Sequence, residues 1–211
     1  MSLTVITGED GQARCSWCEG WAVYRHYHDT VWGMPCADDA VLFEKLCLES
    51  FQAGLSWRTI LARRDALRAA FHGFDPGRMA MMTSEDVSRL LADARIIRHR
   101  GKIEAVIHNA RQLPALQQAF GSLAAFVWSF EPAPEDRPAL ITPAWLQANT
   151  APPAAQAMAK SLRQQGWKFL GPTTCHAFMQ SMGLVNDHLP GCEARIRCGE
   201  ARERFQPPRL S

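Results

Sequence analysis

Long apolar runs are missing from this chain of 211 residues, and their absence excludes several classes of protein. No eighteen consecutive residues are apolar, so we expect no membrane-spanning helix. Residues 1–13 lack the basic region and the following apolar region of a secretory signal, and we expect them to form a flexible lead. The sequence therefore favours a cytoplasmic protein.

The chain also has no strong excess of charge and no even set of cysteines. Its net charge is +2, which permits a nucleic-acid partner without demanding one. Seven scattered cysteines argue against a secreted disulfide framework and suit a reducing compartment, where some of them could bind a metal. The length fits one domain, which we place at residues 14–198, followed by a flexible tail at 199–211. Nothing in the composition requires an obligate partner, so we expect a monomer.

Sustained period-two alternation, the mark of a β-strand, is absent as well, and the sequence predicts an all-α fold. Residues 15–35 are aromatic and polar without a clear period. A short helix should begin at Pro76, and Pro114 should break or kink a longer one. Capping residues, terminal glycines and helical periodicity predict the remaining helices, at Val41–Ala53, Arg58–Phe71, Val87–Ala94, Lys102–Gln118, Pro152–Gln165 and Pro172–Met182. The segment Leu123–Phe130 is short and aromatic.

Residues of metal-binding type stand at both ends of the chain. Cys15 and His28 lie near the start, and His188 and Cys192 lie near the end, four positions apart. Two thiolates and two imidazoles suit a structural zinc site. The spacing leaves Cys18 and Cys198 as other candidate ligands, and it equally allows ordinary buried thiols and surface histidines.

An acidic residue, Glu49, falls on an apolar line of the predicted helix 41–53. A carboxylate facing inward is unfavourable unless a cation or hydrogen-bond donors meet it. It could pair with an internal arginine or cap a backbone group, or it could receive a cationic ligand. The neighbouring sequence is rich in aromatic residues, whose flat faces suit core packing and also the binding of a flat cation: Trp17, Tyr24, Tyr27, Trp32 and Trp57.

A basic run at residues 95–102 lies between two predicted helices. Arg98, Arg100, Gly101 and Lys102 could form a tight turn in which backbone amides and positive side chains hold a phosphate group. The same run could equally be a solvated loop.

Several longer strings, in this order along the chain, resemble the 3-methyladenine-DNA glycosylase I family. The resemblance extends from Arg14 to about Cys192, and its strings are Arg14-Cys15-Ser16-Trp17, Tyr27-His28-Asp29, Trp32-Gly33, residues 48–57 (LESFQAGLSW), residues 96–103 (IIRHRGKI), residues 126–130 (FVWSF), Phe178-Met179-Gln180 and residues 183–188 (GLVNDH). Val31, Ser50 and His176 depart from the usual pattern, and the last two put the substrate range in doubt.

The resemblance implies a helix-hairpin-helix glycosylase fold with a structural zinc that ties the two ends of the domain together. It implies the zinc ligands Cys15, His28, His188 and Cys192. It also implies that Glu49 is the acid that recognises the damaged base, with Trp57, Tyr27, Tyr24, Trp32 and Trp17 as its aromatic surroundings.

The expected activity is the removal of 3-methyladenine from double-stranded alkylated DNA, with free 3-methyladenine as the product. Arg98, Arg100, Gly101 and Lys102 would contact the DNA, and Leu55 would enter the emptied base stack. No aspartate lies between Gly101 and Ser129, and no lysine suggests a Schiff base, so we expect hydrolysis without strand cleavage. The main alternative is a non-catalytic zinc protein that binds damaged DNA. A thiol redox protein using Cys15 and Cys18 would need a βαβ context that the sequence lacks.

Overall fold

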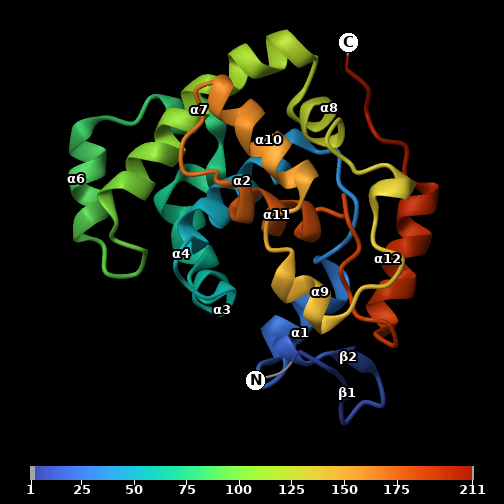
Figure 1. Ribbon diagram of the computed structural model, residues 1–211. Helices are drawn as coiled ribbons and strands as arrows, with labels where there is room; N and C mark the ends of the chain where they lie inside the picture. Colours follow the sequence, from blue (N-terminus) through green and yellow to red (C-terminus); the bar gives the residue numbers. More distant parts are fainter. Residues whose placement is uncertain (1–2, 211) are drawn as a thin grey trace.

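A computed structural model describes residues 3–210 and contains twelve α-helices and two short β-strands among them (Figure 1). The elements are β1 (Val5–Thr7), β2 (Ala13–Cys15), α1 (Ala22–Thr30), α2 (Asp39–Gln52), α3 (Trp57–Leu61), α4 (Arg64–Ala70), α5 (Pro76–Ala80), α6 (Ser84–Ala92), α7 (Arg100–Phe120), α8 (Leu123–Trp128), α9 (Pro143–Ala148), α10 (Pro153–Gln164), α11 (Pro172–Ser181) and α12 (Glu193–Arg204). Three 3₁₀ turns join them, at Ser16–Cys18, His72–Phe74 and Pro134–Asp136. The helical body agrees with the predicted all-α class.

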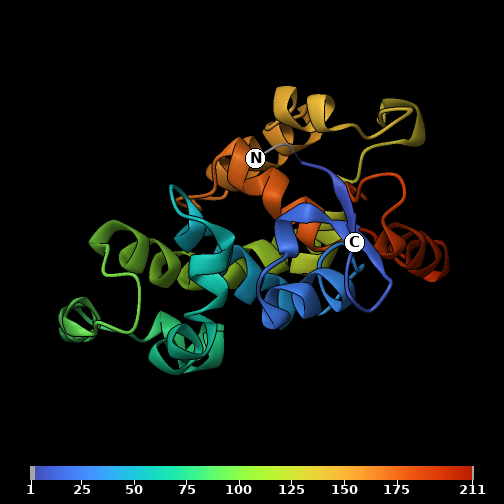
Figure 2. The same cartoon turned by 90° about the horizontal axis from the view of Figure 1, so that it is seen from below.

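Helix α2 lies in the middle of the fold and contacts α3, α7, α8 and α11 (Figures 1 and 2). The Asp38 carboxylate begins it by accepting hydrogen bonds from the amides of Ala40 and Val41. Apolar side chains are buried on several of its sides, so tertiary packing rather than one apolar face stabilises this helix. Its C-terminal turn leads to Gly54, which has a φ of 79°.

Helix α7 continues through Pro114 without the break that the sequence predicts. Proline lacks an amide hydrogen, so the Ala110 carbonyl loses its usual partner within the helix. Buried side chains of Leu113 and Leu116 hold both sides of the proline against the core. Packing therefore overrides the local effect of proline here.

The predicted helix at 58–71 is two helices in the structure, α3 and α4, and the segment without a clear period contains α1. The tail also differs from its description as a flexible segment, because α12 continues to Arg204. Neither α9 nor α12 has an apolar period strong enough to have been predicted.

The lead is not without structure, because β1 pairs antiparallel with β2. A tight turn closes this hairpin, with the Gly8 amide donating to the Gln12 carbonyl over 2.9 Å. Arg14 connects it to the helical body through an ion pair with Asp29 of α1 at 2.9 Å, and it pairs within the hairpin with Asp10 at 2.6 Å. The strands are three residues long, too short for alternation to reveal them.

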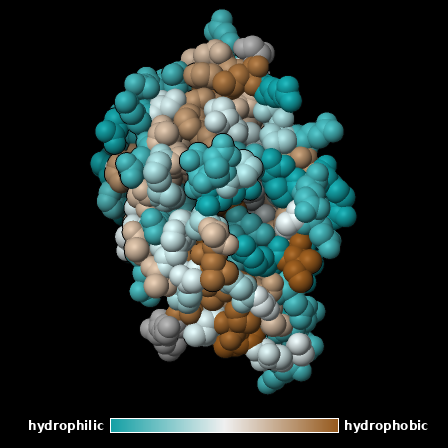
Figure 3. Space-filling view, turned by 45° about the vertical axis from the view of Figure 1, so that its right-hand side comes forward, coloured by the Kyte–Doolittle hydropathy of each residue, from teal (hydrophilic) through white to brown (hydrophobic). Residues whose placement is uncertain are grey.

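The N-terminal segment packs against the C-terminal helix α12, which contacts both β2 and α1 (Figures 1 and 2). A small apolar cluster joins them, separate from the main core, and contains Cys15, Ile141, Leu189, Cys192 and Ala194. On the face in Figure 3, hydrophilic residues surround separate groups of hydrophobic ones. Each helix in the described range 3–210 is too short or too polar to cross a bilayer.

Gly183 fixes the approach of the segment after α11 to residues 33–35. Its φ is 76°, and a Cβ atom there would lie 2.6 Å from the Pro35 nitrogen and 2.8 Å from the Gly33 carbonyl oxygen. Gly191 has a φ of 88°, but a Cβ atom there would meet open space, with no neighbouring atom within 4 Å. A substitution at Gly183 would therefore cause both backbone strain and steric overlap, whereas one at Gly191 would cause backbone strain alone.

We predict that Gly183→Ala lowers the free energy of unfolding by clearly more than the ~1–2 kcal/mol expected for Gly191→Ala, where only left-handed strain acts. Urea unfolding of the two variants measures the difference. Equal losses would contradict the close approach at Gly183.

Candidate functional site

The predicted aromatic residues and Glu49 line one cavity of about 120 Å³. A cavity of ~150 Å³ can enclose a benzene ring, so this smaller one could hold only part of a larger flat ring system, which would extend from its open side. Its walls come from the first 3₁₀ turn and from α1, α2, α3 and α11. They are Trp17, Tyr24, Tyr27, Trp32, Glu49, Gln52, Trp57, Ala177 and Gln180.

The aromatic rings that line the cavity pack in two groups. The centroid of Trp17 lies 5.1 Å from those of Tyr24 and Trp32, and Tyr27 lies 5.2 Å from Trp57 with an interplanar angle of 36°. These are ordinary aromatic packing distances. The structure thus brings together all five aromatic residues that the sequence grouped around Glu49, and it adds Gln52, Ala177 and Gln180.

The Glu49 side chain is buried, with 3% of its residue surface exposed, and its two oxygens differ in their surroundings. Oε1 lies 3.0 Å from the Lys45 Nζ atom. Oε2 has no hydrogen-bond partner among the residues that the structure describes. Burial raises the pKa of Glu49, while Lys45 acts to lower it. One oxygen is therefore held and the other is free to accept a ligand donor.

Besides the three further lining residues, the sequence analysis missed Lys45, which contacts Glu49. Its Nζ atom donates to the Tyr27 Oη atom over 2.6 Å and lies 3.4 Å from the centroid of the Trp57 ring. Lys45 does not line the cavity, so its ammonium group lies behind the wall. Burial lowers the pKa of Lys45 to about 8, against the opposing effect of Glu49. Its position four residues before Glu49, on the same face of a helix, was the available signal.

A second cluster contains the four residues implied as metal ligands. All are buried, and one donor atom from each of Cys15, His28, His188 and Cys192 lies within 4.8 Å of the others. The Cys192 Sγ atom is 3.5 Å from His28 Nε2 and 3.5 Å from His188 Nδ1. Tetrahedral zinc bonded to sulfur and nitrogen separates such atoms by ~3.6 Å, so these donors fit the ion.

Outer partners orient the two histidines. His28 Nδ1 lies 2.8 Å from Asp29, and His188 Nε2 lies 3.1 Å from the Trp32 carbonyl oxygen. Such hydrogen bonds fix the ring nitrogen that faces a metal. Cys18 and Cys198 lie beside this cluster, with their thiols near the Cys15 and Trp32 carbonyl oxygens, but neither belongs to the set of four mutually close donors. Their geometry therefore favours the set of four over the alternatives left open by spacing.

The basic run forms the connection between α6 and α7. Arg98 and Arg100 are exposed, and Arg100 lies 3.3 Å from Glu104. Gly101 lies in the first turn of α7 rather than in a left-handed turn, and a Cβ atom there would be 3.2 Å from the Phe169 ring. A side chain at this position would press against the Phe169 ring, and the left-handed turn that the sequence suggested is not formed.

Lys102 is not placed to hold phosphate as expected, because it is 5% exposed and points into the protein. Its ammonium donates to the Phe51 carbonyl over 2.7 Å and to the Ala53 carbonyl. These carbonyls end α2, where a positive charge stabilises the helix. Lys102 therefore connects the α6–α7 hairpin to the helix that carries Glu49.

The predicted wedge residue and the three departures from the family pattern differ in their exposure and contacts. Leu55 is 41% exposed in the loop between α2 and α3. Val31 follows α1, and the buried Ser50 hydroxyl donates to the Leu46 carbonyl over 2.9 Å. His176 is buried and lies 3.3 Å from Asp187, away from the lining of the small cavity. Neither Ser50 nor His176 changes the aromatic wall.

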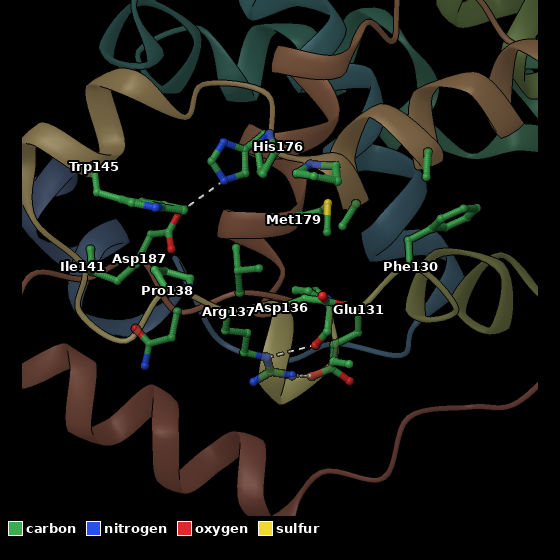
Figure 4. Close-up of a pocket in the computed structure, with 18 of the residues that line it drawn as sticks. Phe130, Glu131, Asp136, Arg137, Pro138, Ile141, Trp145, His176, Met179 and Asp187 are labelled. Carbon is green, nitrogen blue, oxygen red and sulfur yellow. Dashed lines mark hydrogen bonds and ion pairs between the residues drawn. The ribbon is translucent and has the colours of Figure 1, made fainter.

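A larger cavity of about 680 Å³ lies beside His176 (Figure 4). Two close pairs of side chains lie at its walls, His176 with Asp187 at 3.3 Å and Arg137 with Glu131 at 2.9 Å. Figure 4 shows the two pairs on separate parts of the wall, with Trp145 beside Asp187. Size alone would favour this larger cavity as the binding site. The small cavity, however, combines an unpartnered carboxylate oxygen with flat aromatic rings.

The chain is similar in sequence to methyladenine glycosylases. The family model of methyladenine glycosylase matches residues 17–196. The DNA-3-methyladenine glycosylase 1 of Escherichia coli K12 is 47% identical over 180 residues, which are 85% of this chain and 95% of that protein. The DNA-3-methyladenine glycosylase of Haemophilus influenzae is 43% identical, covering 86% of this chain and 97% of that protein.

The chain is also similar in structure to solved 3-methyladenine DNA glycosylases. A crystal structure of 3-methyladenine DNA glycosylase I superposes with a TM-score of 0.77 at 48% identity, covering 85% of this chain and 98% of that one. A structure that describes 3-methyladenine recognition by the Staphylococcus aureus enzyme has a TM-score of 0.76 at 37% identity, covering 86% and 96%.

We predict that Lys102→Met lowers the free energy of unfolding by about 2–3 kcal/mol, because two carbonyls at the end of α2 lose a charged donor. Lys160→Met, at an exposed position of α10, serves as the matched control and should change it by less than ~0.5 kcal/mol. Urea unfolding measures both. A loss at Lys102 as small as that of the control would show that its contacts contribute little.

Proposed function

The chain belongs to the methyladenine glycosylase family, and from that premise we propose that it removes 3-methyladenine from alkylated double-stranded DNA. The product would be free 3-methyladenine. Because a base inside a duplex is unreachable, the damaged nucleotide would rotate out of the stack and into the small aromatic cavity. We further propose that the protein acts as a monomer in the cytoplasm, a compartment that its seven free cysteines suit.

The single observation that carries the proposal is the free Oε2 atom of Glu49 at the aromatic wall. A methylated adenine offers an exocyclic amine as a hydrogen-bond donor and a flat, positively charged ring. Glu49 would accept the donor, and the Trp57 and Tyr27 rings would stack on the base. Tyr24, Trp32 and Trp17 would complete the walls and exclude water.

The chemistry needs little beyond this recognition. Methylation of the ring makes adenine cationic and therefore a good leaving group, so strong general-acid catalysis is dispensable. The bond between C1′ and the base breaks, the electron pair leaves with the base, and water adds to C1′ with loss of a proton. No covalent link to the protein is required, and the proposed enzyme leaves the DNA strand intact.

On the DNA side, we propose that Arg98, Arg100 and the backbone amide of Gly101 contact phosphate, since both arginines are exposed beside the start of α7. Leu55, exposed in the loop after α2, would enter the gap left by the base. Lys102 would support these contacts from inside, by holding the hairpin against α2.

We also propose that Cys15, His28, His188 and Cys192 bind one zinc ion. Bound zinc would supply a structural cross-link, because four protein ligands leave no position for a reacting water. The ligands come from both ends of the domain, and His28 directly follows Tyr27 of the aromatic wall. Holding these segments together would keep the cavity in shape.

We predict that Glu49→Gln reduces the rate of base release by about 10- to 100-fold, because an amide replaces the ionised acceptor. Chromatography of bases released from alkylated DNA measures the rate. Glu85→Gln, an exposed change on α6, should leave it unchanged. Full activity of Glu49→Gln would remove Glu49 from recognition, and no release by the unmodified protein would favour a non-catalytic damage-binding role.

We predict that Cys192→Ser reduces zinc well below one ion per chain and lowers the melting temperature, because a thiolate ligand is lost. Elemental analysis and thermal unfolding measure the two effects. Cys198→Ser is the matched control, since its thiol lies near Met34 and Trp32 instead. One zinc per chain in Cys192→Ser would contradict the assigned ligands.

A further inference from the structure

Lys45 places a built-in positive charge beside the carboxylate that receives the base. Its Nζ atom lies 3.0 Å from Glu49 Oε1, and both side chains are almost fully buried. A buried carboxylate without a counter-charge would penalise a neutral base strongly. Here the ammonium already supplies that counter-charge, so the site carries no net charge while the lysine is protonated.

The same ammonium also faces the ring on which a base would stack. It lies 3.4 Å from the centroid of the Trp57 ring and 4.9 Å from that of the Tyr27 ring. Lys45 therefore already makes cation–π contacts with the two rings that would attract a cationic base. Since Lys45 does not line the cavity, a base could enter without displacing it. A cationic base would then meet a second positive charge behind the wall.

We propose that Lys45 is a specificity-determining residue whose protonation sets how strongly the cavity prefers a cationic base to a neutral one. This inference rests on the proposed function of the same cavity. With the lysine protonated, the preference is weak and the hydrogen-bond donors and shape of the base decide binding. With the lysine neutral, Glu49 keeps its negative charge uncompensated and the preference for a cation is strong.

The charged and titratable groups around Lys45 determine the pH at which this change occurs. Glu49 and Glu44 on α2 favour the protonated lysine, whereas burial and Arg64 on α4 disfavour it. The Tyr27 hydroxyl on α1 accepts a hydrogen bond from it. The resulting pKa is about 8, lower than the usual value of a lysine. The proton is thus present below that pH and is lost above it.

The experiment compares two matched duplexes across pH 7–9. One contains 3-methyladenine, which carries a fixed positive charge, and its base release is followed in single turnovers. The other contains the neutral isostere in which the ring nitrogen at position 3 is replaced by carbon, and its binding affinity is measured. With the protein well below saturation the release rate includes the DNA-binding step, so its ratio to the association constant of the isostere cancels general effects of pH on DNA binding.

For the unmodified protein we expect the ratio to rise about tenfold from pH 7 to pH 9, because neutral Lys45 is about one-tenth populated one unit below its pKa. In Lys45→Met the rise centred near pH 8 should be absent, and at pH 9 its ratio should match that of the unmodified protein. Lys160→Met should follow the unmodified protein throughout.

A flat ratio in the unmodified protein, or the same rise in Lys45→Met, would overturn the inference while leaving the glycosylase activity in place. If Lys45→Met fails to fold, the pH profile of the unmodified protein decides alone. No release of 3-methyladenine at any pH would instead overturn the proposed function, and the inference would fall with it.

Discussion

A buried carboxylate with one oxygen held and the other free is the constraint around which this protein is built. Glu49 lies at the centre of the fold on α2, where an unpaired negative charge is unfavourable. Lys45 stabilises one oxygen from the previous turn of the helix. The aromatic rings limit access of water to the other, which leaves an acceptor ready for a ligand before any ligand arrives.

The rest of the structure keeps that acceptor in position. Asp38 begins α2, and the carboxylate of Asp39 joins its first turn to the start of α8 by accepting from the amides of Leu123 and Ala124. Lys102 holds the other end of α2 against the α6–α7 hairpin. A helix fixed at both ends gives the Glu49 side chain a defined orientation, as recognition of one small flat molecule requires.

Sequence reasoning could predict most of the site because its residues lie on regular elements or in distinctive strings. Periodicity placed Glu49 facing inward, and the cluster of Cys15, His28, His188 and Cys192 was implied by resemblance where spacing alone left alternatives. Lys102 was assigned to the surface wrongly, because charge in a hairpin gives no sign of which carbonyls lie nearby. Lys45 was missed for the same reason: a lysine is read as exposed unless its buried partner is already known.

The remaining differences arise from tertiary packing. Pro114 is accommodated inside α7 by buried neighbours, and the hairpin of β1 and β2 is too short for a period to reveal. Elements such as these depend on contacts between distant segments, which a local pattern does not contain. The aromatic cavity was predictable as a group of residues, but its depth and its free oxygen were not.

The most direct test of the account is a crystal structure of this protein with 3-methyladenine bound. It should show the base against Trp57 in the small cavity, with its exocyclic amine within hydrogen-bond distance of Glu49 Oε2 and Lys45 still on Oε1. A base bound in the larger cavity beside His176, or one whose amine lies away from Glu49, would contradict it.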